Sequence, residues 1–393
     1  MNRPIVLVFA RYYLPGYRSG GPARSIANMV ERFGDEFHFR IITSDRDIGD
    51  NDPYEGIVPD IWCEAGKAEV MYLSARQHGF AGIAKLMQQT PHDLVYLNSF
   101  FDAGYTAIPL LLRRLGLTPN KPYVMAPRGE FSPGAIALKA SRKRFYLRLI
   151  RTFGLAQDVV WQASSAYEAS DIKNMDGSAT ARICIAPNLS SSDSCNASQH
   201  FFLQRKPGDP LRIVFLSRIS PKKNLHFALR VLRQSQHPIV FDIYGPVTDE
   251  TYWQRCQAEI KTLPNHVRAI YHGHIPPARV SKVISGYDLF FLPTLGENYG
   301  HVIAESLSVG TPILISDTTP WRNLQTLGVG WDLSLNEEAS FLHSIQYCIR
   351  LNADEYTTWR AFIRGYAAKK LSDPEVVEAN RQLFLSALSL EGK

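Results

Sequence analysis

The chain has 393 residues, of which 45% are apolar and 20% charged, and its net charge is +6. This composition is typical of a soluble globular protein, the length predicts two domains of about 150–200 residues each, and the absence of a run of about 18 apolar residues argues against a transmembrane helix. The positive charge favours anionic partners in general. Scattered cysteines, odd in number, indicate neither a disulfide framework nor a zinc site, and favour a reducing cytoplasm: Cys63, Cys184, Cys195, Cys256 and Cys348.

The first half of the chain alternates short apolar runs with helical segments. Residues 5–9 end at Arg11 with no small-residue cleavage site after them, so we expect a buried strand and not a signal peptide. Gly20 and Gly21 then precede a helical segment. Such a turn lets backbone N–H groups approach a phosphate or sugar hydroxyl, although a lone Gly-Gly turn is more often plain chain reversal. The alternation predicts a parallel sheet covered by helices on both faces. Further strands are expected at residues 39–43, 70–73, 94–97, 123–126 and 159–162.

A basic segment follows the strand that ends at Ala126. No acid occurs between Glu130 and Asp158, and the cations of this segment alternate with aromatic and aliphatic residues. Such a helix can lie on an anionic membrane surface, or its apolar face can cover the sheet while the cations are solvated. Nucleic acid is not an expected partner, because no nucleic-acid-binding module accompanies the charge. The candidate membrane contacts are Lys139, Arg142, Lys143 and Arg144, and Arg148 and Arg151 continue the pattern.

A serine-rich polar segment from about residue 184 to residue 210 is the best linker candidate. We therefore expect a first domain over residues 1–188 and a second over 189–373. Strands of the second half are expected at residues 212–216, 239–244, 268–272, 289–292 and 312–316. Two α/β halves joined by a hinge place a ligand in the cleft, where loops at the carboxyl ends of both sheets converge.

Loops of the second half contain charged residues that are candidates for ligand binding. Arg218 and Lys223 lie five residues apart, in a loop that begins a helix, and together they favour a bound dianion. Gly245 and the loop around Ile275 follow the next two strands, where backbone groups can bind a nucleotide base.

A second pair of charges falls on the segment from Phe290 to Asp317. Glu297 lies in a loop and Glu305 eight residues later in a helix, with backbones about 12 Å apart or less, the span from a sugar ring across a diphosphate to a ribose. The N-terminus of that helix offers free N–H groups and a positive dipole end to a phosphate. The alternative is that Glu297 is an ordinary loop acid and Glu305 a solvated acid, neither with a role in binding. The loop and helix start contribute Asn298, Tyr299, Gly300 and His301.

Together these elements resemble the retaining glycosyltransferases of family 4, often called group 1, which have the two-domain GT-B fold. The resemblance rests on Glu297 and Glu305 within ENYGHVIAESLSVGTPIL, on Arg218 with Lys223, on the glycine pair, and on Pro187-Asn188 between the domains. It implies two Rossmann-like domains facing across a cleft, with a last helix, about residues 374–393, that crosses back to the first domain.

The resemblance also implies a function. A sugar would move from a nucleotide-diphosphate sugar, held mainly by the second domain, to a glycan or lipid-linked oligosaccharide held mainly by the first, without a metal or other cofactor. Surface polysaccharide biosynthesis in the cytoplasm, with a peripheral position on the inner face of the plasma membrane, is the expected setting. Arg218, Lys223 and Glu297 would be catalytic, and Glu305 would bind the ribose.

Two further readings stay open. A sugar-nucleotide epimerase or a phosphorylase of the same fold would use the same charges, and a non-catalytic subunit would bind a nucleotide sugar without turnover.

One position departs from the family pattern. Many members carry His-Gly where this chain has Arg128-Gly129. Arg128 is expected to contact a phosphate or the acceptor, to leave the sugar held in a different way, or to pair with Glu130 or Glu168.

Overall fold

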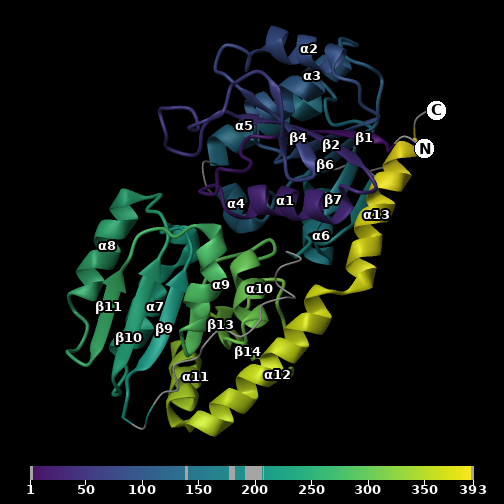
Figure 1. Ribbon diagram of the computed structural model, residues 1–393. Coiled ribbons are helices and arrows are strands. Elements are labelled where there is room, and N and C mark those ends of the chain that lie inside the picture. The colour runs from purple at the N-terminus through teal and green to yellow at the C-terminus, as the bar shows by residue number, and fades with distance from the viewer. Residues whose placement is uncertain (1–2, 138–139, 177–181, 191–205, 207, 391–393) are drawn as a thin grey trace. The chain divides into compact units, whose positions relative to one another are not determined.

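Two β-sheets organise the chain. A computed structural model describes residues 3–137, 140–176, 182–190, 206 and 208–390, so Lys139, Cys195 and most of the serine-rich segment lie outside the described residues. The chain divides into one unit made of Met1–Leu189 with Pro374–Lys393 and a second unit made of Ser190–Asp373 (Figure 1).

The first unit is built on an eight-stranded sheet in the order β3-β4-β2-β1-β5-β6-β7-β8. All neighbouring strands run parallel except β3 and β4. The carboxyl ends of the parallel strands therefore meet at one edge of the sheet. The strands are β1 (Ile5–Ala10), β2 (His38–Ser44), β3 (Trp62–Ala65), β4 (Ala68–Leu73), β5 (Leu94–Asn98), β6 (Tyr123–Ala126), β7 (Val160–Ala163) and β8 (Arg182–Ile185).

Helices cover both faces of this sheet. Val6 and Val8 of β1 pack with helices α1 and α13, whereas Leu7 and Phe9 pack with α2, α3, α5 and α6 on the opposite face, as the period of two along a strand requires. The helices are α1 (Gly21–Phe33), α2 (Phe80–Gln89), η1 (Ala103–Ala107), α3 (Ile108–Arg114), α4 (Pro133–Ala137), α5 (Ala140–Thr152), α6 (Ala166–Asp176) and α13 (Pro374–Leu388).

The last helix, α13, belongs to the first unit. Its Phe384 lies with ring centroids 6.2 Å from Phe33 and 5.1 Å from Phe37. Its Asn380 donates hydrogen bonds to the carbonyl oxygens of Pro187 (2.8 Å) and Val376 (2.9 Å). This confirms the expectation that the last helix packs on the N-terminal part of the chain.

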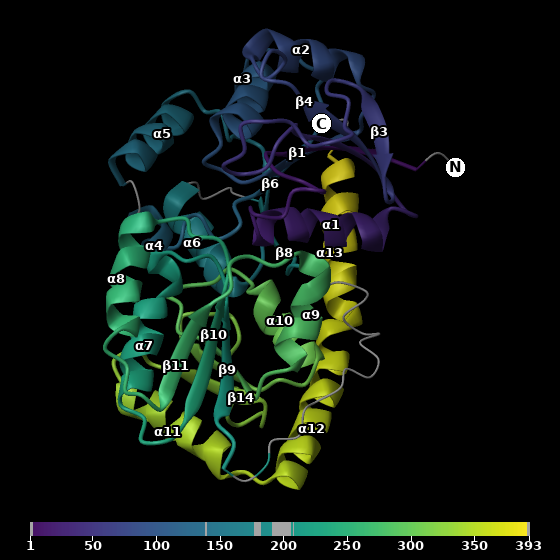
Figure 2. The ribbon, with the colours of Figure 1, turned by 60° about the vertical axis from the view of Figure 1, so that its left-hand side comes forward.

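The second unit is built on a six-stranded sheet in the order β11-β10-β9-β12-β13-β14, with all neighbours parallel. Helices α7, α8 and α11 pack together on one side of it, and α9, α10 and α12 on the other (Figure 2). The strands are β9 (Leu211–Leu216), β10 (Ile239–Tyr244), β11 (Val267–Tyr271), β12 (Leu289–Leu292), β13 (Ile313–Ser316) and β14 (Gly330–Leu333). The helices are η3 (Pro221–Lys223), α7 (Leu225–Arg233), α8 (Glu250–Ile260), α9 (Pro277–Ser285), α10 (His301–Ser308), α11 (Glu338–Arg350) and α12 (Ala353–Leu371).

A buried arginine fixes the ends of α9 and α10. Arg360 of α12 is 3% exposed and donates to the carbonyl oxygens of Tyr287 (2.6 Å) and Ser285 (3.0 Å) and to the hydroxyl of Thr311 (2.8 Å). Burial lowers the pKa of Arg360 to about 10, so the guanidinium stays charged at neutral pH. Helix α10 is therefore held at its C-terminal end.

These two sheets confirm the predicted α/β class with two parallel-sheet halves. In the part of the chain that the structure describes, no helix combines the length and apolarity needed to cross a bilayer.

Candidate active site

An ion pair joins two of the residues selected from the sequence. Lys223 ends the short helix η3 after β9, and Glu297 lies in the loop between β12 and α10. The ammonium of Lys223 donates to a carboxylate oxygen of Glu297, and the two side chains are only 10% and 13% exposed. Opposite charges separated by 74 positions in the chain thus meet in a largely desolvated place, where their interaction is stronger than at the surface.

Backbone contacts lock the two loops of this pair together. The carbonyl oxygen of Lys222 accepts hydrogen bonds from the backbone N–H of Leu295 (2.7 Å) and the hydroxyl of Thr294 (3.0 Å). Hydroxyls of Ser316 (2.5 Å) and Thr318 (2.8 Å) donate in turn to the carbonyl oxygen of Thr294. Groups following β9, β12 and β13 therefore fix the position of Glu297 relative to Lys223.

Helix α10 begins directly after this loop. Gly300 caps it with φ 78° and ψ 63°, a left-handed conformation that favours glycine, and a Cβ at Gly300 would come within 2.7 Å of the Ile303 side chain. The glycine is thus required by the backbone itself, apart from any approach of a ligand. The first N–H groups of α10, from His301 onward, lie ahead of its hydrogen-bonded turns and form the positive end of its dipole.

Glu305 is buried within α10, at 5% exposure. Glu305 is therefore not a solvated surface acid. Burial, with a smaller contribution from the negative charge of Glu305, raises the pKa of Tyr299 above its ordinary value, so the Tyr299 hydroxyl stays protonated at neutral pH. Glu305 and Tyr299 are consequently close enough to interact.

Tyr299 is held by Ser190 and Trp321, which no sequence motif indicated. Its hydroxyl shares a 2.7 Å hydrogen bond with that of Ser190, and its carbonyl oxygen accepts one of 2.5 Å from the indole N–H of Trp321. The ring of His301 packs edge-on against Tyr299, with centroids 4.9 Å apart. Asn298 and His301 are half-buried beside it. The only sequence signal for Trp321 is its place in the loop after β13, at the carboxyl edge of the sheet.

Arg218 lies at the same edge but behaves differently from Lys223. It follows β9 by two residues and is exposed, and its side chain makes no hydrogen bond or ion pair with any residue that the structure describes. Its five N–H donors are therefore open to a ligand.

The base-binding candidates lie beside Arg218. Gly245 has φ 138°, and a Cβ there would lie 1.8 Å from the carbonyl oxygen of Ser217, so only glycine lets the loops after β9 and β10 approach. The N–H of Gly245 donates to the carbonyl oxygen of Gly273 (2.7 Å). This hydrogen bond joins the loop after β10 to the loop after β11, which contains the half-buried Ile275.

The remaining candidates belong to the first unit. Gly20 precedes α1 with φ 73°, and nothing lies within 4 Å of a Cβ built there, so the position is open. Gly21 is the first residue of α1, and both glycines are exposed.

Arg128 is bound by neutral groups. Its guanidinium donates to the side-chain oxygens of Asn98 (2.8 Å) and Asn188 and to the hydroxyl of Tyr96 (2.6 Å). Tyr96 in turn donates to Gln162 (2.5 Å). All three nitrogens of Arg128 are therefore engaged within the first unit.

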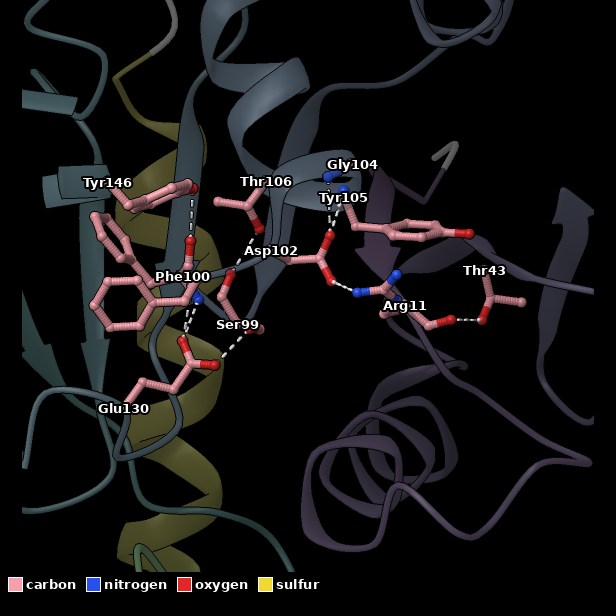
Figure 3. A network of polar contacts seen from close by, with 11 residues as sticks. Arg11, Thr43, Ser99, Phe100, Asp102, Gly104, Tyr105, Thr106, Glu130 and Tyr146 are labelled. Atoms are coloured by element: carbon pink, nitrogen blue, oxygen red, sulfur yellow. Dashed lines mark hydrogen bonds and ion pairs between the residues drawn. The ribbon is translucent and has the colours of Figure 1, made fainter. Parts of the chain in front are cut away.

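The carboxylates expected beside Arg128 are occupied elsewhere. Glu130 accepts from the Ser99 hydroxyl (2.6 Å) and from the backbone N–H groups of Phe100 (2.6 Å) and Phe101 (3.0 Å) (Figure 3). Burial raises the pKa of Glu130, and these hydrogen bonds oppose that shift. Glu168 accepts from the backbone N–H groups of Gly129 (2.5 Å) and Ser164 (2.7 Å).

A further polar cluster at this edge was not selected from the sequence. Figure 3 shows Asp102 accepting from the backbone N–H groups of Gly104 (3.0 Å) and Tyr105 (2.8 Å) and from the guanidinium of Arg11 (3.4 Å). Arg11 is 53% exposed and follows β1, so its position at a strand end was the available signal. No group of three or more His, Cys, Asp or Glu side chains among the described residues is placed to hold a metal ion.

Comparison with known proteins finds one family model that matches part of the chain. Residues 197–351 match the family model "Glycosyl transferases group 1". No curated protein sequence matches the chain.

Solved structures match over the whole chain. Anabaena Alr3699/HepE, in complex with UDP and glucose, has a TM-score of 0.67 at 16% identity and covers 99% of this chain and 100% of its own. Sucrose-phosphate synthase from Thermosynechococcus elongatus has a TM-score of 0.68 at 15% identity, covering 98% and 100%. WaaG, a glycosyltransferase involved in lipopolysaccharide biosynthesis, has a TM-score of 0.67 at 14% identity, covering 99% and 100%.

At these identities the structures show the shared GT-B fold, and the family match falls on the unit that contains Lys223, Glu297 and α10. Over residues 197–351 the chain is thus similar to the group 1 glycosyltransferases, and over nearly its whole length it shares the GT-B fold of the solved structures.

Proposed function

We propose that this protein is a group 1 glycosyltransferase, which moves a hexose from a nucleotide-diphosphate sugar to a glycan or lipid-linked oligosaccharide acceptor with retention of configuration at the anomeric carbon. The observation that carries the proposal is the Lys223–Glu297 pair, which lies directly ahead of α10. Cationic donors and a helix N-terminus suit a diphosphate, and carboxylates suit sugar hydroxyls.

The proposed reaction needs stabilisation of a leaving group. The bond from the anomeric carbon to the diphosphate oxygen breaks, a bond from the acceptor hydroxyl oxygen forms on the same face, and the acceptor proton passes to the departing phosphate. Negative charge then develops on the diphosphate, where preorganised donors lower the barrier. Arg218, Lys223 and the first N–H groups of α10 supply these donors, so we assign no protein base, metal or other cofactor.

The carboxylates have binding roles in this proposal. Glu297 accepts hydrogen bonds from donor-sugar hydroxyls and Glu305 from the ribose hydroxyls. Before a donor binds, Lys223 and Glu297 neutralise one another, which lowers the cost of keeping both charges desolvated. When the nucleotide sugar binds, its diphosphate accepts part of the hydrogen bonds that the Lys223 ammonium can donate. The remaining contacts to the nucleotide sugar are assigned to Gly20, Gly21, Gly245, Ile275, Asn298, Tyr299, Gly300 and His301.

The two units are assigned different substrates. Residues 189–373 bind the nucleotide sugar, and residues 1–188 with the helix near 374–393 bind the acceptor. The structure of HepE with UDP-glucose supports a hexose donor, and the part of WaaG in lipopolysaccharide biosynthesis supports an acceptor of the surface-polysaccharide class. We place the reaction in the cytoplasm, at the inner face of the plasma membrane.

The test is release of nucleoside diphosphate from a panel of nucleotide sugars, each with and without candidate acceptors. The proposal expects release from one donor class only when an acceptor is present. Release or interconversion of the donor without an acceptor would indicate an epimerase or a hydrolase, and donor binding with no turnover for any acceptor would indicate a binding subunit.

A further inference from the structure

Helix α5 of the first unit presents a second apolar surface to solvent. Phe145, Leu149 and Phe153 are 64%, 39% and 58% exposed. Their spacing of four residues places them on one side of a helix, one turn apart, and the last lies just beyond its end. Three large apolar side chains in a row, each more than a third exposed, are unusual on a surface that meets only water.

This outward stripe is not the side by which α5 packs on its sheet. Leu147 and Ile150 are buried in the core together with Trp161 of β7, and the hydroxyl of Tyr146 donates to the carbonyl oxygen of Phe100 (2.8 Å). The sheet is thus already covered by other residues of the same helix. Covering the sheet, which the sequence left as one explanation of the apolar residues, does not account for Phe145, Leu149 and Phe153.

Exposed arginines occur on the same helix as the stripe. Arg142, Arg144, Arg148 and Arg151 are all exposed, and no acid occurs in the sequence from residue 131 to residue 157. Lys143 is different, because its ammonium donates to the carbonyl oxygen of Ala135 (2.6 Å) and lies 4.8 Å from the centroid of the Phe101 ring. It therefore faces inward. Lys139 lies outside the described residues.

The end of α3 extends this surface. The guanidinium of Arg114 donates to the carbonyl oxygen of Phe153 (3.2 Å), so the two chain segments lie side by side (Figure 2). Leu115 and Leu117, which follow Arg114, are 55% and 41% exposed. Exposed apolar and basic residues from two separate elements thus lie near one another.

We propose that this α5 surface, formed by Phe145, Leu149, Phe153, Arg142, Arg144 and Arg148, docks the protein on an anionic lipid bilayer. A bilayer meets both features at once, since apolar side chains enter the boundary of headgroups and acyl chains while arginines meet lipid phosphates. Each cation near an anionic leaflet adds to the attraction.

A second copy of the chain is a poorer occupant of this surface. A two-fold symmetric contact would place the same patch on both copies, and hence arginine against arginine without an acid in the patch to compensate. Like charges that face each other across an interface disfavour association.

This inference adds a partner to the proposed function and is tested separately from it, because vesicle binding requires neither donor nor acceptor. The experiment is sedimentation of the full chain with vesicles of phosphatidylcholine alone and of phosphatidylcholine mixed with phosphatidylglycerol. We expect binding to the anionic vesicles only, weakened by added salt because the phosphate contacts are screened.

Two sets of variants locate the surface. F145S/L149S/F153S and R142Q/R144Q/R148Q are each expected to lower the vesicle partition coefficient at least about 10-fold. The matched controls on α12 are F362S, at a phenylalanine 55% exposed, and K369Q/K370Q, at two exposed lysines. These controls should bind vesicles as the unmodified chain does. Far-UV circular dichroism and Tm should be unchanged throughout, since every altered side chain is exposed.

A fluorescence measurement provides a second readout that does not depend on loss of binding. Phe145→Trp should show a blue shift of its tryptophan emission on anionic vesicles, and Phe362→Trp should show none. No binding of the unmodified chain to anionic vesicles, equal binding by all variants, or a change of oligomeric mass in F145S/L149S/F153S would overturn the proposal, the last in favour of self-association.

Discussion

Arg128 and Arg218 occupy the same place in two different sheets. Each follows a parallel strand by two residues, Arg128 after β6 and Arg218 after β9. Arg128 donates from all three guanidinium nitrogens to Asn98, Asn188 and Tyr96, whereas the exposed Arg218 makes no side-chain contact of this kind with the described part of the chain. A cation at a strand end is thus not in itself a ligand site, and its neighbours decide whether its donors remain open.

The polar groups at the carboxyl edges of the two sheets differ in the same way. In the first unit the strand-end polar groups bind one another and fix loops, as Asp102 and Glu130 do (Figure 3). In the second unit Lys223 and Glu297 neutralise each other ahead of the N-terminus of α10, and Arg218 is open. We therefore expect substitutions at the first edge to act on stability, and those at the second edge to act on turnover.

The largest effect is expected for Lys223→Ala and Glu305→Ala. Each should lower turnover at least about 100-fold while the protein stays folded, because each removes a group assigned to the diphosphate or the ribose. The measurement is kcat/KM for nucleotide-sugar consumption in the presence of an acceptor.

Lys223→Ala needs a control for folding, since it also leaves the largely buried Glu297 without its partner. The double variant Lys223→Ala/Glu297→Ala removes that uncompensated charge and should recover thermal stability without recovering turnover. Near-normal turnover in both single variants would remove the assignment.

The next effect is a loss of stability at Arg128. Arg128→Met leaves three oxygen acceptors without their donor and should cost about 2 kcal/mol, which lowers Tm by roughly 4–8 °C in a unit of this size. Affinity for the nucleotide sugar should not change. An unchanged Tm with a large loss of turnover would instead make Arg128 a residue that contacts the acceptor or a phosphate.

Arg218→Ala should show the converse behaviour. It removes an exposed side chain that has no partner among the residues that the structure describes, so Tm should stay within about 1 °C of that of the unmodified chain. Turnover should fall about 10-fold or more, because one of the assigned phosphate donors is lost. Calorimetric unfolding alongside the activity assay separates the two quantities, and a destabilised variant would contradict the contrast with Arg128.

The smallest effect is expected at Arg381, a second arginine of the first unit. It is paired with Glu36 at 2.7 Å, with side chains 31% and 41% exposed, and Arg381→Ala should cost less than about 1 kcal/mol. The hydrogen bond from Arg381 lowers the pKa of Glu36. This contribution is therefore present near neutral pH and is lost as the pH falls through the lowered value. Urea unfolding at neutral and acidic pH measures this contribution. A large loss of stability in Arg381→Ala at neutral pH would mean that the exposed contacts of Arg381 stabilise the protein as much as the contacts of Arg128 do.

Much of the fold follows from local sequence. Apolar runs bounded by glycine, proline or charged residues predicted eleven strands to within about two residues of the observed bounds. Among the strands that the structure describes, β3, β8 and β14 were missed. Each lies at the end of its sheet and has only four residues. No residue of β3 or β8 is buried, so these strands lack the buried apolar run by which a central strand is recognised.

The candidate site was predictable only in part. The types and spacing of Arg218, Lys223, Glu297 and Glu305 indicated a diphosphate-linked sugar, because those charges suit its chemistry. The partners of Arg128 were not predictable, since Asn98, Tyr96 and Asn188 lie 30, 32 and 60 positions away in the chain. The same holds for the bond between Ser190 and Tyr299, which spans 109 positions. Spacing along a sequence indicates which residues belong to one element, but long-range partners are set by the packing of whole sheets.

The most direct test of the donor site is a thermal-shift panel of nucleoside diphosphates and nucleotide sugars, applied to the unmodified chain and to Arg218→Ala. A ligand at about 100 times its dissociation constant adds roughly 2.7 kcal/mol to stability. We predict that one nucleotide class raises the Tm of the unmodified chain and that this rise is largely lost in Arg218→Ala, whose own Tm is unchanged. An equal rise in both proteins would contradict the assignment of Arg218 to the diphosphate, and no rise with any nucleotide would contradict the donor site as a whole.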